Sequence, residues 1–354
     1  MLYRLLGGTV ATIPPERRYN MPKSMRTSLE TKILSGLKRC GIASGRRIVL
    51  GVSGGADSIA MLDAMVRSSR SSLVVAHLNH CLRGEESDDD EDFVRGEAAK
   101  RDLPFESERA AVAEKAATSR RNIEAVAREM RYAFLTRVAE THGGDVVATA
   151  HTRNDQVETI LLRLIRGTSP RGLRGIFEQR RLGESVTLVR PMLDSTRDEV
   201  LEHCAHYGLA FRTDSSNLSL TLSRNRVRHD LLPHLRALNP QFEESLLRTA
   251  VLIGEDAALL DMLAADQFTR AISQGAPDIS LDAKSIRDLP VSIRSRMIRL
   301  WLEKVRGDLL RIDKTHLDAV DRLIMRGLGG KAVELPGGGL VRIERGILHF
   351  SGHT

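Results

Sequence analysis

Cysteine, aromatic residues, lysine and long apolar runs are all scarce in this sequence of 354 residues. The three cysteines, Cys40, Cys81 and Cys204, form no Cys-x-x-Cys pair. This argues against a disulfide framework, a zinc ribbon and a four-cysteine iron–sulfur cluster, and it favours a reducing cytoplasm. No run of about 18 apolar residues occurs, which excludes a membrane-spanning helix and predicts no membrane partner.

Only 13 aromatic residues are present, so extensive platforms for stacking bases are not expected. Nine lysines stand against 44 arginines, whose planar guanidinium suits phosphate, although a G+C-rich genome also enriches arginine. The net charge of +7 is uneven, because residues 237–354 hold 16 acidic and 16 basic side chains. The whole excess therefore lies in the first 236 residues, which are expected to meet an anionic partner.

The chain is longer than one typical domain of about 100–200 residues. We expect an N-terminal extension at 1–25, a main domain at 26–236 and a smaller C-terminal region at 237–354. Residues 1–20 are basic with a short apolar stretch. Two interpretations stay open, a targeting segment and a translation start upstream of the true one at Met21 or Met25. We favour the second, in which the extension is mis-started or disordered.

Strand-like and helix-like segments alternate through the main domain. Three short apolar runs predict buried strands, at Ile48–Val52, Leu73–Leu78 and Val146–Ala150. The segments expected to be helical are Ser28–Cys40, Ser58–Arg67, Asn122–Glu140, Asp155–Arg166 and Thr196–Tyr207. This order predicts an α/β fold, an open, mostly parallel, Rossmann-like sheet with helices on both faces. Residues 166–183 are expected to form a long basic loop.

The C-terminal region has a different pattern. Phe242–Ala271 and Ile293–Val305 carry apolar residues at helical spacing. Short strands punctuated by Leu-Pro-Gly-Gly-Gly follow Gly327. We therefore expect a helical region and then a small α+β part.

A Gly-Gly turn stands between the first predicted strand and the next helix. Its residues are Ser53, Gly54, Gly55, Ala56, Asp57 and Ser58. Glycines let the backbone approach an anion, and a helix N-terminus offers free N–H groups to it. No Gly-Lys-[Ser/Thr] follows, so this is not a Walker A loop, and the dinucleotide Gly-x-Gly-x-x-Gly is also absent. The alternative is an ordinary turn without a ligand.

Polar residues also follow the other two predicted strands. His77, His80 and Cys81 follow one strand, but no second cluster accompanies them, so no metal is assigned. After the next strand, Asp155 and Glu158 are spaced to converge on one helix face. A carboxylate pair in a cleft suits an ammonium group or Mg²⁺. The alternative is helix capping by Asn154 or Asp155.

Arginines form the remaining candidates. Glu124, Arg128 and Arg131 share a helix face, where a surface salt-bridge ladder is the alternative to a site. Two basic stretches offer phosphate contacts for RNA, with a solvated surface as the alternative. The candidates for RNA contact in them are Arg166, Arg171, Arg174, Arg224, Arg226 and Arg228.

The turn SGGADS resembles the loop of the PP-loop ATP pyrophosphatase superfamily. Taken with HLNHCLRG, NIEAVAREMRY, AHTRNDQVETILLRLIRGTSPRGL, RPML and DSSNLSLTLSRNRVRH, the sequence is similar to the tRNA(Ile)-lysidine synthetases. These strings lie between about residues 46 and 236, and 237–354 matches more weakly through LPGGGLVRIERGILHF.

The resemblance implies an activity and its participants. ATP would adenylate the C2 oxygen of the wobble cytidine in the CAU-anticodon isoleucine tRNA, and the ε-amine of free L-lysine would then displace AMP. Ser53–Ser58 would cradle the ATP phosphates, with Mg²⁺ offsetting their charge, and His77 and His151 would lie near the nucleotide. The positions that match lysine handling and catalysis are Asp57, Arg131, Asp155 and Glu158. A cytoplasmic homodimer docking tRNA through 237–354 is the family-based expectation.

The sequence departs from the family at Asn154, where many members have an acid, and this puts a metal role for that position in doubt. The nearest rival is a cytidine 2-thiolation enzyme of the same superfamily. Such an enzyme needs cysteines for sulfur transfer or an iron–sulfur cluster, and the absence of a Cys-x-x-Cys pair argues against it. A metabolic amidotransferase or synthetase is a second rival, but no nucleophilic cysteine motif supports a glutaminase part. A non-catalytic RNA-binding protein would not require the set of Asp57, Arg131, Asp155 and Glu158.

Overall fold

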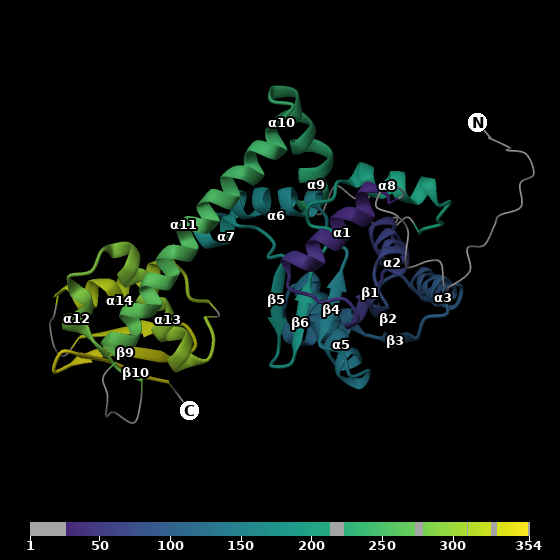
Figure 1. Cartoon of the computed structure of the whole chain (residues 1–354). Coiled ribbons are helices and arrows are strands. Elements are labelled where there is room, and N and C mark those ends of the chain that lie inside the picture. Colours follow the sequence, from purple (N-terminus) through teal and green to yellow (C-terminus); the bar gives the residue numbers. More distant parts are fainter. Residues whose placement is uncertain (1–25, 213–222, 273–278, 310, 327–330, 353–354) are drawn as a thin grey trace, which may run out of the picture. The chain divides into compact units, whose positions relative to one another are not determined.

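The computed structural model describes residues 26–212, 223–272, 279–309, 311–326 and 331–352 (Figure 1). The expected extension at 1–25 lies outside the described residues. The chain divides into two compact units. The first holds the described residues up to Gly167 together with Arg174–Leu247, and the second holds Thr168–Leu173 and the residues from Arg248 onward.

The first unit alternates strands and helices along most of its length. Its strands are β1 (Arg47–Gly51), β2 (Ser72–Asn79), β3 (Phe105–Arg109), β4 (Val146–Thr149), β5 (Gln179–Leu182) and β6 (Val186–Val189). Its helices are α1 (Ser28–Arg39), α2 (Ala56–Ser68), α3 (Glu85–Ala99), α4 (Val112–Ser119), α5 (Ile123–Thr141), α6 (Arg153–Arg166), α8 (Arg197–His206), α9 (Ser223–Arg226), the π-helical η4 (Val227–Leu231) and α10 (Leu232–Leu238). The helix α11 (Phe242–Ala271) begins in this unit.

The six strands form one sheet in the order β3-β2-β1-β4-β6-β5. The neighbours from β3 to β6 pair in parallel, and the edge strand β5 pairs antiparallel with β6. The predicted open, mostly parallel sheet is confirmed. The loop predicted over 166–183 is wrong at Gln179–Leu182, because these residues pair as an edge strand whose first three side chains stay exposed and give no apolar signal.

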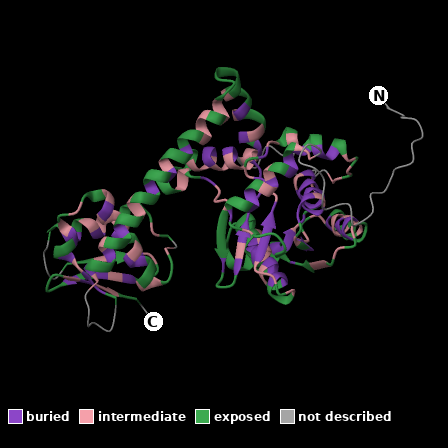
Figure 2. Cartoon of the chain, viewed as in Figure 1, coloured by how far each residue is buried: buried purple, intermediate pink, exposed green. Residues whose placement is uncertain are grey.

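Alternate residues of the sheet enter two separate cores. In β1, Ile48 and Leu50 pack beneath α1, α2, α3 and α8, whereas Val49 packs with α4 and α5 on the other face. Figure 2 shows the central strands as mostly buried. The predicted helices on both faces of the sheet are therefore confirmed, and the carboxyl ends of the strands are left free to carry a site.

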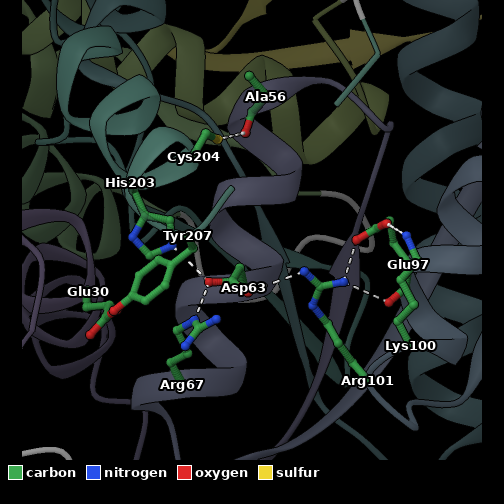
Figure 3. A network of polar contacts seen from close by, with 10 residues as sticks. All are labelled: Glu30, Ala56, Asp63, Arg67, Glu97, Lys100, Arg101, His203, Cys204 and Tyr207. Atoms are coloured by element: carbon green, nitrogen blue, oxygen red, sulfur yellow. Dashed lines mark hydrogen bonds and ion pairs between the residues drawn. The ribbon is translucent and has the colours of Figure 1, made fainter. Parts of the chain in front are cut away.

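A buried polar network holds α8 against α2 (Figure 3). Asp63 of α2 accepts hydrogen bonds from Arg67 at 2.5 Å and from Nε2 of His203 on α8 at 3.2 Å, and Arg101 reaches its other oxygen at 3.3 Å. Burial alone would raise the pKa of Asp63, but the bonds from His203 and Arg67 and the charge of Arg101 hold it below its ordinary value. The position of α8 is thereby fixed relative to the start of α2.

The second unit is a small α+β structure. Its elements are α7 (Pro170–Leu173), the remainder of α11, β7 (Leu281–Asp282), α12 (Ala283–Arg287), α13 (Val291–Arg306), α14 (Lys314–Arg326), β8 (Ala332–Leu335), β9 (Gly339–Glu344) and β10 (Ile347–Ser351). The strands form an antiparallel sheet in the order β7-β10-β9-β8. Trp301 is fully buried in the core of this unit, and its indole N–H donates to the carbonyl of Ile279 at 2.7 Å. The predicted helical region with a small α+β part is confirmed. No helix among the described residues is long and apolar enough to cross a membrane.

Candidate active site

The Gly-Gly turn leads from β1 directly into the first turn of α2. Gly54 has a φ of +90°, which favours glycine, and Gly55 is the N-cap without a side-chain hydrogen bond to the helix. The Ser58 hydroxyl donates to the carbonyl of Gly55 at 2.9 Å and accepts from the amide of Ser53 at 3.2 Å. The free N–H groups of α2 therefore face the end of the sheet, in an arrangement suited to an anion.

Arg212 supports this turn from a distant part of the chain. Its amide donates to the carbonyl of Gly54 at 3.0 Å, and its guanidinium pairs with Asp90 at 2.9 Å and with Asp89 at 3.3 Å. The conformation of the turn is thus tied to the acidic start of α3. No local motif in the sequence indicates this role of Arg212.

Asp57, in the first turn of α2, forms an ion pair with Arg197 at the start of α8, at 2.6 Å. The Asn154 side chain accepts from the amide of Arg197 at 3.0 Å, and the amide of Arg153 donates to the carbonyl of Ser195 at 2.9 Å. Partial burial raises the pKa of Asp57, and Arg197 opposes that shift. Asn154, where the sequence departs from the family that it resembles, thus helps to place the Arg197 guanidinium beside Asp57.

Asp155 completes a capping box at the start of α6. Its Oδ2 accepts from the amide of Thr152 at 2.8 Å and from the Thr152 hydroxyl at 3.1 Å. The capping interpretation therefore holds for Asp155, with Thr152 as the N-cap. Asp155 also lies near enough to affect the titration of Asp57 and Glu158 electrostatically.

Glu158 is 1% exposed and is held by two arginines. Arg228 donates to its Oε1 at 2.6 Å, and the Nε of Arg224 lies 3.4 Å from its Oε2 without a hydrogen bond. Burial raises the pKa of Glu158, and Arg228 opposes the shift. The structure thus brings three of the predicted site carboxylates into one electrostatic group with Arg228.

The two histidines lie at the ends of β2 and β4, the strands on either side of β1. His77 is buried and its Nδ1 is 2.9 Å from the carbonyl of Val52, immediately before the Gly-Gly turn. His151 lies 3.0 Å from the Thr149 hydroxyl. Burial lowers the pKa of both rings, most strongly for His151, where nearby arginines add to the effect. Both are therefore neutral near pH 7.

Arg131 lies on α5 and has a different environment from the carboxylates. Its Nε is buried without a hydrogen-bond partner, and its guanidinium lies over the ring of Tyr132, 5.3 Å from the centroid. Burial lowers the pKa of His80 to about 4, and the charge of Arg131 contributes. Arg131 is thus grouped with other cations instead of with the predicted acids.

The six arginines predicted to contact RNA do not share one setting. Arg166 and Arg226 are exposed, whereas Arg224 and Arg228 are half-buried against Glu158. Arg174 lies over the Phe177 ring at 5.0 Å. Arg171 belongs to the second unit and lies 3.9 Å from Asp261. RNA contact by these six residues stays a prediction.

Besides Arg212, two residues of the site were not predicted from the sequence, for different reasons. Thr152 stands three residues before Asp155, and this spacing in the sequence is typical of a capping box. Nothing in the local sequence marks Arg197 apart from its place at a helix start, because its partner Asp57 lies 140 residues away in the sequence. The described residues include no group of three or more His, Cys, Asp or Glu side chains placed to hold a metal ion.

Comparison with known proteins agrees with the resemblance. Residues 25–235 match the model of the PP-loop domain, and residues 281–349 match the model of the TilS substrate binding domain. The chain is 41% identical over 297 residues to the tRNA(Ile)-lysidine synthase of Geobacter sulfurreducens, which covers 82% of this chain and 62% of that protein. It is 35% identical over 316 residues to the tRNA(Ile)-lysidine synthase of Dehalococcoides mccartyi, covering 87% of this chain and 67% of that one. The chain thus spans about two thirds of the length of these relatives.

A solved structure shares the fold. The U34-tRNA thiolase NcsA from Methanococcus maripaludis, with its [4Fe-4S] cluster, superposes with a TM-score of 0.53 at 18% identity. The match covers 64% of this chain and 78% of the thiolase. At this identity the likeness concerns the fold alone.

Proposed function

This chain belongs to the tRNA(Ile)-lysidine synthase family of PP-loop proteins, and from that premise we propose its reaction. It joins free L-lysine to C2 of the wobble cytidine in the CAU-anticodon isoleucine tRNA. The C2 oxygen attacks the α-phosphorus of ATP and pyrophosphate leaves. The ε-amine of lysine then attacks C2, loses a proton, and AMP departs with the oxygen.

This proposal rests on one observation. Three helix N-termini meet at the carboxyl end of the sheet. Those of α2, α6 and α8 bring together Asp57, Asp155 and Arg197 beside an anion-binding turn. Free N–H groups suit the ATP phosphates, and carboxylates suit the ammonium groups of lysine. A cationic and an anionic substrate therefore find complementary groups side by side.

The three carboxylates differ in how freely they can meet a substrate. Asp155 is occupied by the capping box, and Glu158 is buried against Arg224 and Arg228. Asp57 is 37% exposed, and its partner Arg197 is 44% exposed. Since an exposed ion pair is worth at most about 1 kcal/mol, Asp57 exchanges Arg197 for lysine most easily. Its raised pKa also favours Asp57 as acceptor of the proton that the amine must lose.

Mg²⁺ belongs to the proposal as the companion of ATP. It commonly takes one or two carboxylates and completes its coordination with phosphate oxygens and water, so no protein cage is needed. Asp57, which belongs to the Ser53–Ser58 turn, and Asp155, whose charge acts on Asp57, are suited to hold it there. It would offset the charge of the phosphates. A cytoplasmic location and a homodimer stay predictions.

Cytidine 2-thiolation is the alternative reaction on this fold. Burial raises the pKa of Cys40 and of Cys204 to about 11, so both thiols stay protonated near pH 7. Sulfur transfer requires a thiolate or a cluster bound by cysteines. Cys81 alone does not supply that chemistry, and we therefore favour lysine ligation.

Isotope-labelled lysine tests the proposal. The full chain is incubated with ATP, labelled lysine and a transcript of the CAU-anticodon isoleucine tRNA, and the nucleosides are analysed by mass spectrometry. We expect labelled lysidine at the wobble position, with equimolar AMP and pyrophosphate, and none without ATP or with methionine tRNA that shares the anticodon. An unmodified cytidine would refute the proposal, and a sulfur-containing cytidine formed with a sulfur donor would establish the alternative.

A further inference from the structure

Four arginines surround one tyrosine ring at the carboxyl end of the sheet. The guanidinium carbons of Arg180, Arg128 and Arg131 lie 4.5, 5.0 and 5.3 Å from the centroid of the Tyr132 ring. Arg190 donates to the Tyr132 hydroxyl at 3.3 Å and also to the carbonyl of Phe177. These four arginines and Tyr132 are called the Tyr132 cluster below.

The Tyr132 cluster holds no carboxylate. In the described part of the chain, none of its four arginines forms a salt bridge with an acid, unlike Arg224 and Arg228 nearby. Arg190 is 1% exposed, and its Nε, like that of Arg131, is buried without a hydrogen-bond partner. A buried cation without a counter-charge is costly, so the arrangement is matched to an anion that arrives from outside.

The four arginines differ in exposure, from the surface of the protein inwards. Arg128 and Arg180 are exposed, Arg131 is half-buried, and Arg190 and Tyr132 are buried. An anion on the surface therefore meets Arg128 and Arg180 first. Contact with one aromatic ring keeps the guanidinium planes in place, which reduces the entropy lost when a phosphate binds.

The Tyr132 cluster reaches from α5, which packs over β1, β2 and β4, to the edge strand of the sheet. Arg180 lies on the edge strand β5, three strands from β1, whose end carries Ser53–Ser58. At the usual strand spacing this is about 14 Å. A polyanion that reaches the site across this edge of the sheet passes Arg180 before it meets Asp57. The geometry therefore favours a phosphate of the RNA over a phosphate of ATP.

We propose that the Tyr132 cluster binds a phosphodiester of the RNA substrate. Arg128 and Arg180 supply the contacts, and Arg190 with Tyr132 positions them. This gives a role to Arg190, the first residue of the RPML string. The proposal rests on the proposed function for the identity of the RNA.

Binding of an anticodon stem-loop RNA tests the proposal without any catalysis. The Kd of the full chain for the CAU-anticodon stem-loop is measured over a range of salt concentrations, with no ATP or lysine. We expect Arg180→Gln and Arg128→Gln each to raise Kd about five- to tenfold at low salt and to reduce the slope of log Kd against log salt by about one. Arg137→Gln is the matched control, since Arg137 lies on α5 and is paired with Glu108.

The outcomes separate this proposal from its rivals and from the proposed function. Equal Kd and slope in Arg180→Gln, Arg128→Gln and Arg137→Gln would overturn it. So would unchanged RNA binding with a raised KM for ATP, because the cluster would then serve the nucleotide. A reduced slope in a protein that forms no lysidine would leave the RNA site standing and refute only the reaction.

Tyr132→Phe tests the positioning role. It keeps the ring and removes only the hydroxyl that Arg190 contacts. We expect Kd to rise two- to threefold with an unchanged slope, because the number of phosphate contacts stays the same. A Kd equal to that of the unmodified chain would overturn the positioning role.

Discussion

Two charged regions at the same end of the sheet are built in opposite ways. In the carboxylate region, Asp57 is paired with Arg197, and Glu158 with Arg228. In the Tyr132 cluster, the arginines contact a ring, a hydroxyl and a carbonyl, and no acid among the residues that the structure describes. The first region is already neutralised by the protein, and the second carries an uncompensated positive charge.

This contrast explains how one site can take substrates of both signs. A paired carboxylate can exchange its internal cation for a substrate ammonium without a large change in charge. An unpaired arginine gains its counter-charge only when an anion binds, which favours tight contact with phosphate. The comparison predicts that variants in the carboxylate region change lysine use, whereas variants in the Tyr132 cluster change RNA binding.

The largest effect is expected from Asp57→Asn. The amide keeps the shape of the side chain but removes the charge that holds lysine and the best-placed proton acceptor. We expect the kcat/KM for lysine to fall at least about 100-fold, in the range of a lost acid–base group. The measurement is the rate of labelled-lysine incorporation at several lysine concentrations.

Asp145→Asn is the matched control for this variant, because Asp145 forms an exposed ion pair with Arg46 on the same domain. We expect it to act like the unmodified chain. Full activity of Asp57→Asn would contradict the role of the carboxylate region in lysine use, since Asp57 would then have no part in the reaction.

Glu158→Gln is expected to act on stability. Its neutral side chain leaves Arg224 and Arg228 without a counter-charge in a half-buried place. We expect the free energy of unfolding to fall by about 2–3 kcal/mol and Tm by about 5 °C. Glu108→Gln breaks an exposed pair with Arg137 and should cost under about 1 kcal/mol. An unchanged Tm with a raised KM for lysine would instead place Glu158 in direct contact with the substrate.

Most of the fold could be predicted from apolar runs and helical spacing. The strand β1, the helix α5 and the limits of α11 all follow from local pattern. The strands β3 and β5 could not be predicted in this way. Most of their side chains are polar, and they are half-buried in β3 or exposed in β5, so no apolar run marks either strand. Long-range backbone pairing holds both strands in the sheet.

The candidate site was predictable where a motif is local and not where partners are distant. The turn Ser53–Ser58 and the spacing of Asp155 and Glu158 could be read directly. The pairing of Asp57 with Arg197 depends on α8 folding back onto α2, and the Tyr132 cluster joins α5 to segments about 50 residues later. Residues with distant partners are brought together by the topology of the fold, and the spacing of neighbouring residues in the sequence does not reveal it.

A smaller effect is expected from Glu199→Gln, which loosens the start of α8. Glu199 completes a capping box with Thr196 and forms an ion pair with Lys32 at 2.6 Å. Burial alone would raise its pKa, but Lys32, Ser28 and the Thr196 amide lower it to about 2. We expect a loss of about 1–2 kcal/mol at pH 7.

The pH dependence of that loss has a definite sign. The folded pKa of Glu199 lies below its ordinary value of 4.5, so its contribution is present above pH 4.5 and disappears as the pH falls towards 2. The difference in Tm between the unmodified chain and Glu199→Gln, followed by calorimetry, should therefore shrink over that range. A constant difference down to pH 2.5 would contradict the assignment.

The smallest effect, and the sharpest for the comparison, is expected from Arg197→Gln. Because the ion pair with Asp57 is exposed, its loss frees the carboxylate at a cost of at most about 1 kcal/mol. If Arg197 holds the place that lysine takes, the KM for lysine falls about two- to fivefold while the RNA salt slope stays unchanged. Arg180→Gln should do the reverse, leaving the KM for lysine unchanged and reducing the slope. If Arg197→Gln and Arg180→Gln both change the KM for lysine, or both change the salt slope, the carboxylate region and the Tyr132 cluster would act as one site. Their separation by charge would then be wrong.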